Sequence, residues 1–169
     1  MLSQKLLDAL NQQVKFEFSS ANYYLAMAAY CKSEDLDGFA NFFVVQAEEE
    51  KFHAMKMFNF INELGGRALI YGFEDPKNDF TSVEEVFQTA LDHEKIVTDR
   101  INQLMDIAVN EKNYACVSFL NWYVDEQVEE MSMMTGLLNK IKRIGESSHA
   151  IYMLDAELAT RTFTPPAAE

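Results

Sequence analysis

Six polar side chains with metal-binding chemistry interrupt four otherwise apolar helical stripes in the sequence. They are Glu17, Glu50, His53, Glu94, Gln127 and Glu130. A carboxylate in a buried stripe is costly unless a cation or a hydrogen-bond donor offsets its charge. Two divalent cations would balance the four carboxylates, so the pattern predicts a two-metal site. Oxygen ligands with a single histidine and no thiolate favour iron or manganese over structural zinc.

The spacing of these residues places them at one level of a folded helix pair. The first expected turn is centred near Glu34. Glu17 precedes this turn by nearly the same stretch of chain as Glu50 and His53 follow it. Antiparallel helices joined at this turn would bring the three side chains together, about 25 Å from the loop.

A second turn, centred near Glu111, repeats this arrangement in the other half of the chain. The two halves correspond with a constant offset in residue number, so that Glu17 matches Glu94, Glu50 matches Gln127 and His53 matches Glu130. Residues three apart on a helix share a face, so Gln127 and Glu130 can contact one centre. The second half therefore has an amide and a carboxylate where the first has a carboxylate and an imidazole.

Periodicity and capping signals predict an all-α protein, a four-helix bundle with a short fifth helix. The expected helices span about 3–32, 36–64, 82–109, 114–143 and 147–159. We expect a single domain over 1–169, with the bundle over 1–146, the fifth helix over 147–159 and a mobile tail over 160–169.

The irregular link over 67–80 determines the expected topology. About 15 extended residues reach roughly 50 Å, which exceeds the length of a helix of about 28 residues, roughly 42 Å. The link can therefore run the full length of the bundle and let the second and third helices lie parallel. This predicts an up-down-down-up bundle.

Composition excludes several classes of partner. The formal net charge of -13 argues against nucleic acid, and no apolar run is long enough to span a membrane. No basic region followed by an apolar core marks a secretory signal at the N-terminus. Cys31 and Cys116 are expected near opposite ends of the bundle as free thiols in a reducing compartment. We therefore expect a cytoplasmic protein.

The motifs resemble those of the ferritin-like di-iron family, which uses one glutamate from each of two helices and Glu-x-x-His from the other two. Glu17 and Glu94 match the single glutamates, and Glu50 with His53 matches one motif; the other is Gln-x-x-Glu instead. This asymmetry resembles the non-haem bacterial ferritins rather than bacterioferritin. The same resemblance extends to the segments ANYYLAMAAY, ALDHEK and FLNWYVDEQVEE.

The resemblance implies a ferroxidase that oxidises Fe(II) with O2 or peroxide and stores the ferric mineral inside a cage of 24 identical subunits. It implies a first iron bound by Glu17, Glu50 and His53. A second iron would be bound by Glu50, Glu94 and Glu130, with Glu50 bridging the pair.

The resemblance implies roles for further residues. Gln127 would lie beside the iron pair, and Tyr24 matches the family's tyrosine next to the centre, although a plain core tyrosine is an equal alternative. A third iron site matches four acidic residues: Glu49, Glu126, Glu129 and Glu130. A solvated acidic patch is an equal alternative for them. Phe52 stands where bacterioferritin has its haem-binding methionine, so no haem is expected.

Three other interpretations compete with a storage ferritin. A rubrerythrin-like peroxidase is the alternative enzyme, but such proteins often carry a Cys-x-x-Cys segment, which this sequence lacks. A Dps-like mini-ferritin would bind metal between subunits and lack the fifth helix, and a non-catalytic bundle would not need carboxylates at one level.

Among the remaining residues, we expect His93 at the surface and Trp122 in packing, with His149 either channel-lining or at the surface.

Overall fold

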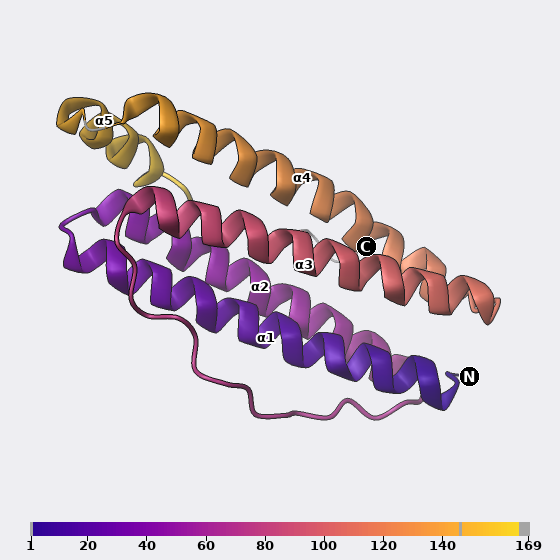
Figure 1. Ribbon diagram of the computed structural model, residues 1–169. Helices are drawn as coiled ribbons and strands as arrows, with labels where there is room; N and C mark the ends of the chain where they lie inside the picture. The colour runs from indigo at the N-terminus through magenta and orange to yellow at the C-terminus, as the bar shows by residue number, and fades with distance from the viewer. Residues whose placement is uncertain (1, 146, 166–169) are drawn as a thin grey trace.

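Five α-helices make up the computed structural model, which describes residues 2–145 and 147–165 (Figure 1). The helices are α1 (Gln4–Ser33), α2 (Asp37–Glu63), α3 (Val83–Asn110), α4 (Tyr114–Ile144) and α5 (Ser148–Leu158). No strand occurs in these ranges, and no helix in them combines the length and apolarity needed to cross a bilayer. The predicted all-α class and helix order are confirmed.

Side-chain caps explain where four of these helices begin. In each case a polar side chain accepts a hydrogen bond from the backbone N–H three residues on, which satisfies a donor that the helix leaves unpaired. The capping residues are Ser3, Ser82, Asn113 and Ser147. At α3 Ser82 and Glu85 form only the first half of a capping box, because the Glu85 carboxylate accepts from the backbone N–H of Thr81 (2.7 Å) instead of that of Ser82.

A residue of α5 caps α2 instead of a local side chain. Leu36 stands at the N-cap position and makes no side-chain cap. Asp155 Oδ1 accepts from the backbone N–H of Gly38 (2.8 Å) and of Phe39 (3.0 Å), and its charge complements the positive end of the helix. A Cβ at Gly38 would lie 1.7 Å from the Asp155 backbone oxygen, so glycine permits the close approach. This contact fixes α5 across the beginning of α2.

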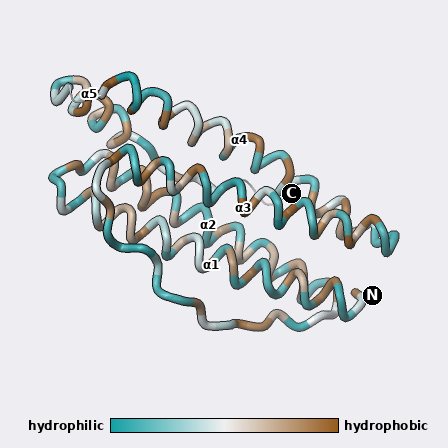
Figure 2. The backbone as a smooth tube through the Cα atoms, in the orientation of Figure 1, coloured by the Kyte–Doolittle hydropathy of each residue, from teal (hydrophilic) through white to brown (hydrophobic). Residues whose placement is uncertain are grey.

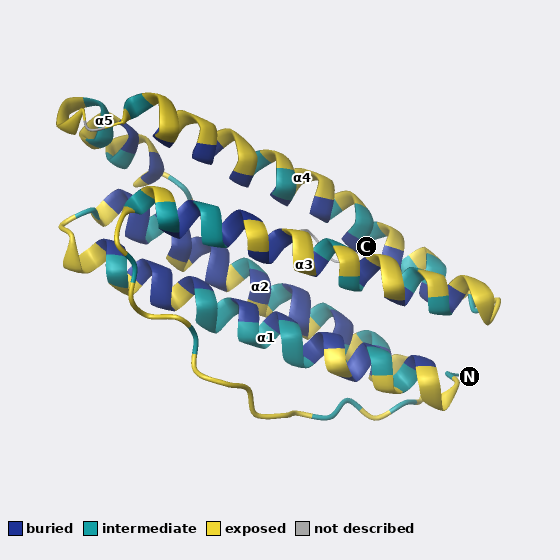
Figure 3. Ribbon diagram, viewed as in Figure 1, coloured by how far each residue is buried: buried dark blue, intermediate teal, exposed yellow. Residues whose placement is uncertain are grey.

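The segment over 64–82 links α2 to α3 along the whole length of the bundle, and most of it is exposed (Figures 1 and 3). This segment returns the chain to the end of the bundle at which α2 begins. Helix α3 therefore runs parallel to α2, and α1 and α4 run opposite to both. Helix α1 packs mainly against α2, and α3 against α4. The predicted up-down-down-up topology is confirmed.

The two turns between paired helices repeat the same backbone conformation. Asp35 and Lys112, which occupy matching positions in the two halves, both adopt a left-handed φ, 58° and 55°. The residue before each donates its N–H to the carbonyl four residues back, and the residue after each donates to the carbonyl five residues back. The constant offset predicted between the halves therefore recurs in the backbone of the turns.

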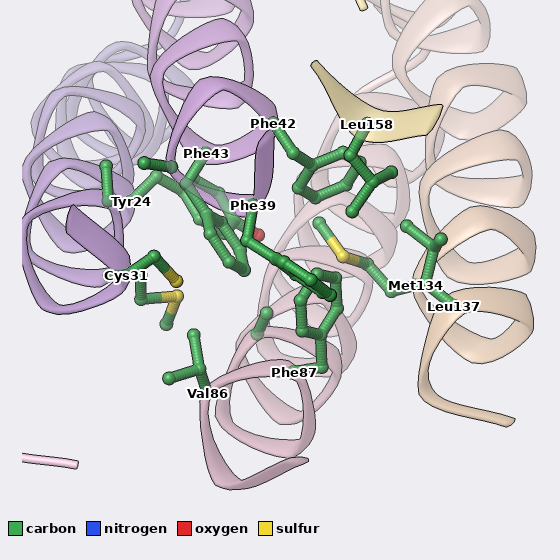
Figure 4. Close-up of a cluster of buried hydrophobic side chains, with 14 of the residues drawn as sticks. Tyr24, Cys31, Phe39, Phe42, Phe43, Val86, Phe87, Met134, Leu137 and Leu158 are labelled. Carbon is green, nitrogen blue, oxygen red and sulfur yellow. The ribbon is translucent and has the colours of Figure 1, made fainter. Parts of the chain in front are cut away.

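Apolar side chains form two core clusters, which are separated along each long helix by polar residues. Hydrophobic and hydrophilic residues alternate along the helices in Figure 2, as expected for amphipathic segments. Phe39, Phe43 and Phe87 lie in the cluster near α5, which Figure 4 shows. On α1, Val14 is the last fully buried member of the cluster far from α5, and Tyr24 is the first fully buried member of the cluster near α5. The gap between them is the level at which the sequence predicts a metal site.

The first residues of the tail lie against α2. The Arg161 guanidinium stacks over the Phe42 ring at 4.3 Å, and the ring centroids of Phe163 and Phe52 are 5.8 Å apart. Cation–π and aromatic contacts thus place these residues on α2, and the mobility expected over 160–169 stays a prediction. Residues 166–169 of that tail lie outside the described ranges.

Both cysteines are buried free thiols. Cys31 belongs to the core cluster near α5 and Cys116 to the other cluster. Burial raises the pKa of the Cys31 thiol to about 12 and that of Cys116 to about 11. Both therefore pack as small apolar groups.

Candidate metal centre

All six polar residues singled out from the sequence lie in the bundle interior, between the two core clusters. They come from all four long helices: Glu17 from α1, Glu50 and His53 from α2, Glu94 from α3, and Gln127 and Glu130 from α4. None of these side chains is more than 6% exposed. None of the six is therefore a solvent-facing residue of an amphipathic helix.

Glu17, Glu50 and His53 form a compact group suited to a metal ion. One possible ligand atom from each lies within 4.8 Å of the other two. Glu17 Oε2 and Glu50 Oε2 are buried, and when both carboxylates are ionised no described residue donates a hydrogen bond to either. His53 Nδ1 lies 3.7 Å from Glu50 Oε2, beyond hydrogen-bond distance. Two orphaned carboxylate oxygens beside an imidazole are the donor set that a divalent cation would satisfy.

Glu94 occupies the opposite side of the centre and is held by two donors. The Tyr24 hydroxyl donates to Glu94 Oε1, and Gln127 Nε2 donates to Glu94 Oε2 at 3.0 Å. Burial, followed by the charge of Glu94, raises the pKa of Tyr24 well above its usual value, so the hydroxyl keeps its proton. The two predicted neighbours of the centre, Tyr24 and Gln127, therefore meet on one carboxylate.

A buried amide holds each of two further carboxylates. Gln13 Nε2 donates to Glu17 Oε1 at 2.8 Å. Gln46 Nε2 donates to Glu130 Oε2, also at 2.8 Å. In each case one carboxylate oxygen is bonded to the amide, and the other remains available.

The metal-free centre is costly to ionise. Burial is the largest cause that raises the pKa of Glu17, Glu50 and Glu94, and the charge of Glu50 adds to it at Glu17. Burial and then the charge of Glu94 raise the pKa of Glu130 to about 8. Like charges around a shared site oppose one another's ionisation, and a bound cation removes that penalty.

The four residues of the implied third iron site line one cavity of about 480 Å³, together with Arg161. The residues are Glu49, Glu126, Glu129 and Glu130. Arg161 Nη2 pairs with Glu49 Oε2 at 2.6 Å, and Glu126 Oε1 lies 3.9 Å from His53 Nε2. The cavity therefore adjoins the buried centre and already contains one protein cation.

Aromatic residues fix the far side of His53. The Trp122 ring lies edge-on to the imidazole with centroids 5.3 Å apart, and the Tyr123 hydroxyl donates to the His53 backbone oxygen at 2.8 Å. Trp122 thus has the packing role expected of it. His149 on α5 is exposed in the single chain, as both alternatives for that residue require.

The expected surface position of His93 is wrong. This side chain is 8% exposed, its Nε2 lies 2.7 Å from Ser20 Oγ, and its ring stacks on Phe16 at 5.3 Å. Burial lowers the pKa of His93 to about 4, so the imidazole is neutral. Helix α1 packs against the side of α3 on which His93 lies, although this side is outside the apolar stripe of α3.

Sequence reasoning missed the roles of Gln13, Gln46 and Arg161. Both glutamines lie in the apolar stripes, and each precedes a site glutamate by four residues, one helical turn. That spacing identifies the partner of Gln13, which is Glu17, whereas Gln46 donates to Glu130 on α4 instead of to Glu50. No comparable pattern marks Arg161, which the tail brings to the centre from beyond α5.

A four-helix bundle with a long crossover and a buried carboxylate–histidine centre is a ferritin-like architecture. The family model described as Ferritin-like domain matches residues 7–144, and the chain belongs to this family.

Individual ferritins are similar to this chain over nearly its whole length. A bacterial non-haem ferritin of Staphylococcus aureus is 49% identical over 163 residues, covering 96% of this chain and 98% of the relative. One from Staphylococcus saprophyticus is 45% identical over the same shares. An engineered closed form of Archaeoglobus fulgidus ferritin superposes with a TM-score of 0.96 at 44% identity, covering 97% of this chain and all of that one. The predicted resemblance to non-haem bacterial ferritins is confirmed, and family membership supports iron storage.

Proposed function

We propose that this protein oxidises Fe(II) to Fe(III) at a two-iron centre inside each bundle and stores the ferric product as mineral in a cage of 24 subunits. The observation that carries the proposal is the pair of orphaned oxygens, Glu17 Oε2 and Glu50 Oε2, beside His53. Elsewhere in the described interior, buried side-chain oxygens and nitrogens have partners. Two Fe(II) ions would neutralise the four buried carboxylates.

The resemblance to non-haem ferritins supports two ligand sets that share one glutamate. Glu17, Glu50 and His53 would bind the first iron, and Glu50, Glu94 and Glu130 would bind the second, with Glu50 shared. The first set includes an imidazole and the second has carboxylates only. The two positions therefore differ in ligand type and in affinity for Fe(II).

The buried carboxylates couple iron binding to proton release. In the metal-free chain burial raises the pKa of each, so each keeps its proton to a higher pH than a solvated carboxyl group does. Fe(II) displaces these protons when it binds. Two Fe(II) ions then supply two electrons, which reduce O2 to hydrogen peroxide or a peroxide to water. Tyr24 holds Glu94 through its hydroxyl while the charge on the iron pair changes.

The cavity lined by Glu49, Glu126, Glu129 and Glu130 would receive iron that leaves or approaches the pair. An acidic wall concentrates cations, which supports a third iron position next to the second. We further propose that the protein works in the cytoplasm, a reducing compartment compatible with its two buried free thiols.

Aerobic addition of Fe(II) tests this proposal. The wild-type protein should generate ferric absorbance in the near ultraviolet well above the rate in buffer. A variant with both Glu50→Ala and His53→Ala should fall to the buffer rate, and Glu48→Gln, an exposed neighbour on α2, should behave as wild type. Equal rates in the double variant and the wild type would contradict the ferroxidase claim. A particle no larger than a dimer on size-exclusion chromatography would contradict the cage.

A further inference from the structure

Two similar chains of hydrogen bonds lead from an arginine through a glutamine to a glutamate of the centre. In the first, Arg100 Nε donates to Gln13 Oε1 at 2.8 Å, and Gln13 Nε2 donates to Glu17 Oε1 at 2.8 Å. Arg100 also stacks over the Phe16 ring at 4.2 Å and donates to the Gln12 backbone oxygen at 3.1 Å.

The second chain repeats these contacts at the other metal position. Arg161 Nη1 donates to Gln46 Oε1 at 2.8 Å, and Gln46 Nε2 donates to Glu130 Oε2 at 2.8 Å. Arg161 stacks over Phe42 at 4.3 Å and donates to its backbone oxygen at 3.2 Å. An arginine is thus placed on a phenylalanine ring and a carbonyl in both cases, although Arg100 comes from α3 and Arg161 from the tail.

The chemistry of the arginine fixes the orientation of each amide. A guanidinium has only donors, so it must face the amide oxygen and turn the amide NH2 toward the carboxylate. Without the arginine, a glutamine could rotate and present its oxygen to the glutamate. The bonded carboxylate oxygen is then occupied, as at Glu17, where the other oxygen, Oε2, is the orphaned one.

We propose that Arg100 and Arg161 are positioning residues, each of which acts through one glutamine to set which oxygen of Glu17 or Glu130 is left for a metal ion. The inference rests on the proposed function only in requiring that the centre bind two ions. Arg161 also pairs with Glu49, so the tail connects the second metal position to the acidic cavity.

Anaerobic titration of the metal-free protein with Co(II), followed by its visible absorption, tests the proposal. His53→Ala assigns the spectrum of the first position. Arg161→Met and Gln46→Ala should each weaken only the ion at the Glu130 position, by about tenfold. Arg100→Met should weaken only the ion at the Glu17 position. Arg143→Met, an exposed arginine at the end of α4, is the matched control and should change neither.

The direction in which Co(II) affinity changes distinguishes a positioning role of the arginine from a purely electrostatic one. Loss of a nearby positive charge alone would tighten cation binding, so unchanged or tighter binding in Arg161→Met would overturn the proposal. Equal weakening of both ions would overturn it as well. Gln46→Ala keeps the arginine, and combining it with Arg161→Met should weaken binding no further than either change alone. Failure of the wild-type protein to bind two Co(II) ions would instead contradict the proposed two-metal centre.

Discussion

Replacing Glu130 with glutamine should stabilise the metal-free protein. Glu130 is 3% exposed, and burial with the charge of Glu94 raises its pKa from 4.5 to about 8. Between those two values the unfolded chain releases this proton while the folded chain keeps it. The unfolded state then binds fewer protons, so the free energy of unfolding falls as pH rises. The stabilising contribution is complete below the ordinary pKa and is lost as pH approaches about 8.

The slope gives the expected size of the effect. A difference of one bound proton changes the free energy of unfolding by about 1.4 kcal/mol per pH unit. Glu130 alone therefore lowers the free energy of unfolding by about 3 kcal/mol between about pH 5 and about pH 7. Glutamine is neutral at both values, and its side-chain oxygen can still accept from Gln46. The metal-free Glu130→Gln variant should therefore be more stable than wild type at about pH 7, by roughly 3 kcal/mol, and less sensitive to pH.

Chemical denaturation in the presence of a chelator measures this difference, with tryptophan fluorescence as the signal and equal subunit concentrations. Glu129→Gln removes the neighbouring exposed carboxylate and should change little. Added divalent cation should reverse the order, because it stabilises the wild-type centre and the variant lacks one ligand. A wild-type protein whose metal-free stability is independent of pH, or a variant less stable than wild type, would refute this reasoning.

Other contacts yield predictions of their own. Asp155→Ala removes the cap of α2 and should lower the free energy of unfolding by about 1 kcal/mol in urea denaturation; an unchanged midpoint would show that the cap contributes nothing. Gly38→Ala should cost about 1–3 kcal/mol, because its Cβ would collide with α5. Tyr24→Phe should keep the helical circular dichroism spectrum but slow Fe(II) oxidation by about tenfold, since Glu94 loses a donor. Cys31 and Cys116 should react with a thiol reagent only after denaturation.

The order, pairing and direction of the helices could be predicted from local signals. Capping residues such as Ser82 and Asn113 mark helix starts, and the length of the link over 64–82 decides whether α2 and α3 lie parallel. Counting from the turns placed Glu17 and Glu94 at the observed level because helix rise is constant. These features depend on neighbouring residues and on chain length alone.

Features that depend on packing between distant elements could not be predicted in this way. His93 is buried by α1, and Asp155 caps α2 only because α5 folds back across it. Arg161 reaches Gln46 from 115 residues away along the chain, through a tail without sequence periodicity. These long-range contacts determine which donor is hydrogen-bonded to each carboxylate. The sequence therefore predicts the ligands of the centre better than it predicts the residues that position those ligands.

The central claim is that one bundle binds two iron ions through a shared Glu50. Crystals soaked with Fe(II) in the absence of oxygen, with data collected at the iron absorption edge, test it most directly. We expect two anomalous peaks inside each bundle, one bound by Glu17, Glu50 and His53 and the other by Glu50, Glu94 and Glu130, with or without a third in the outer acidic cavity. A single peak in the bundle, or iron bound only in the outer acidic cavity, would contradict the account.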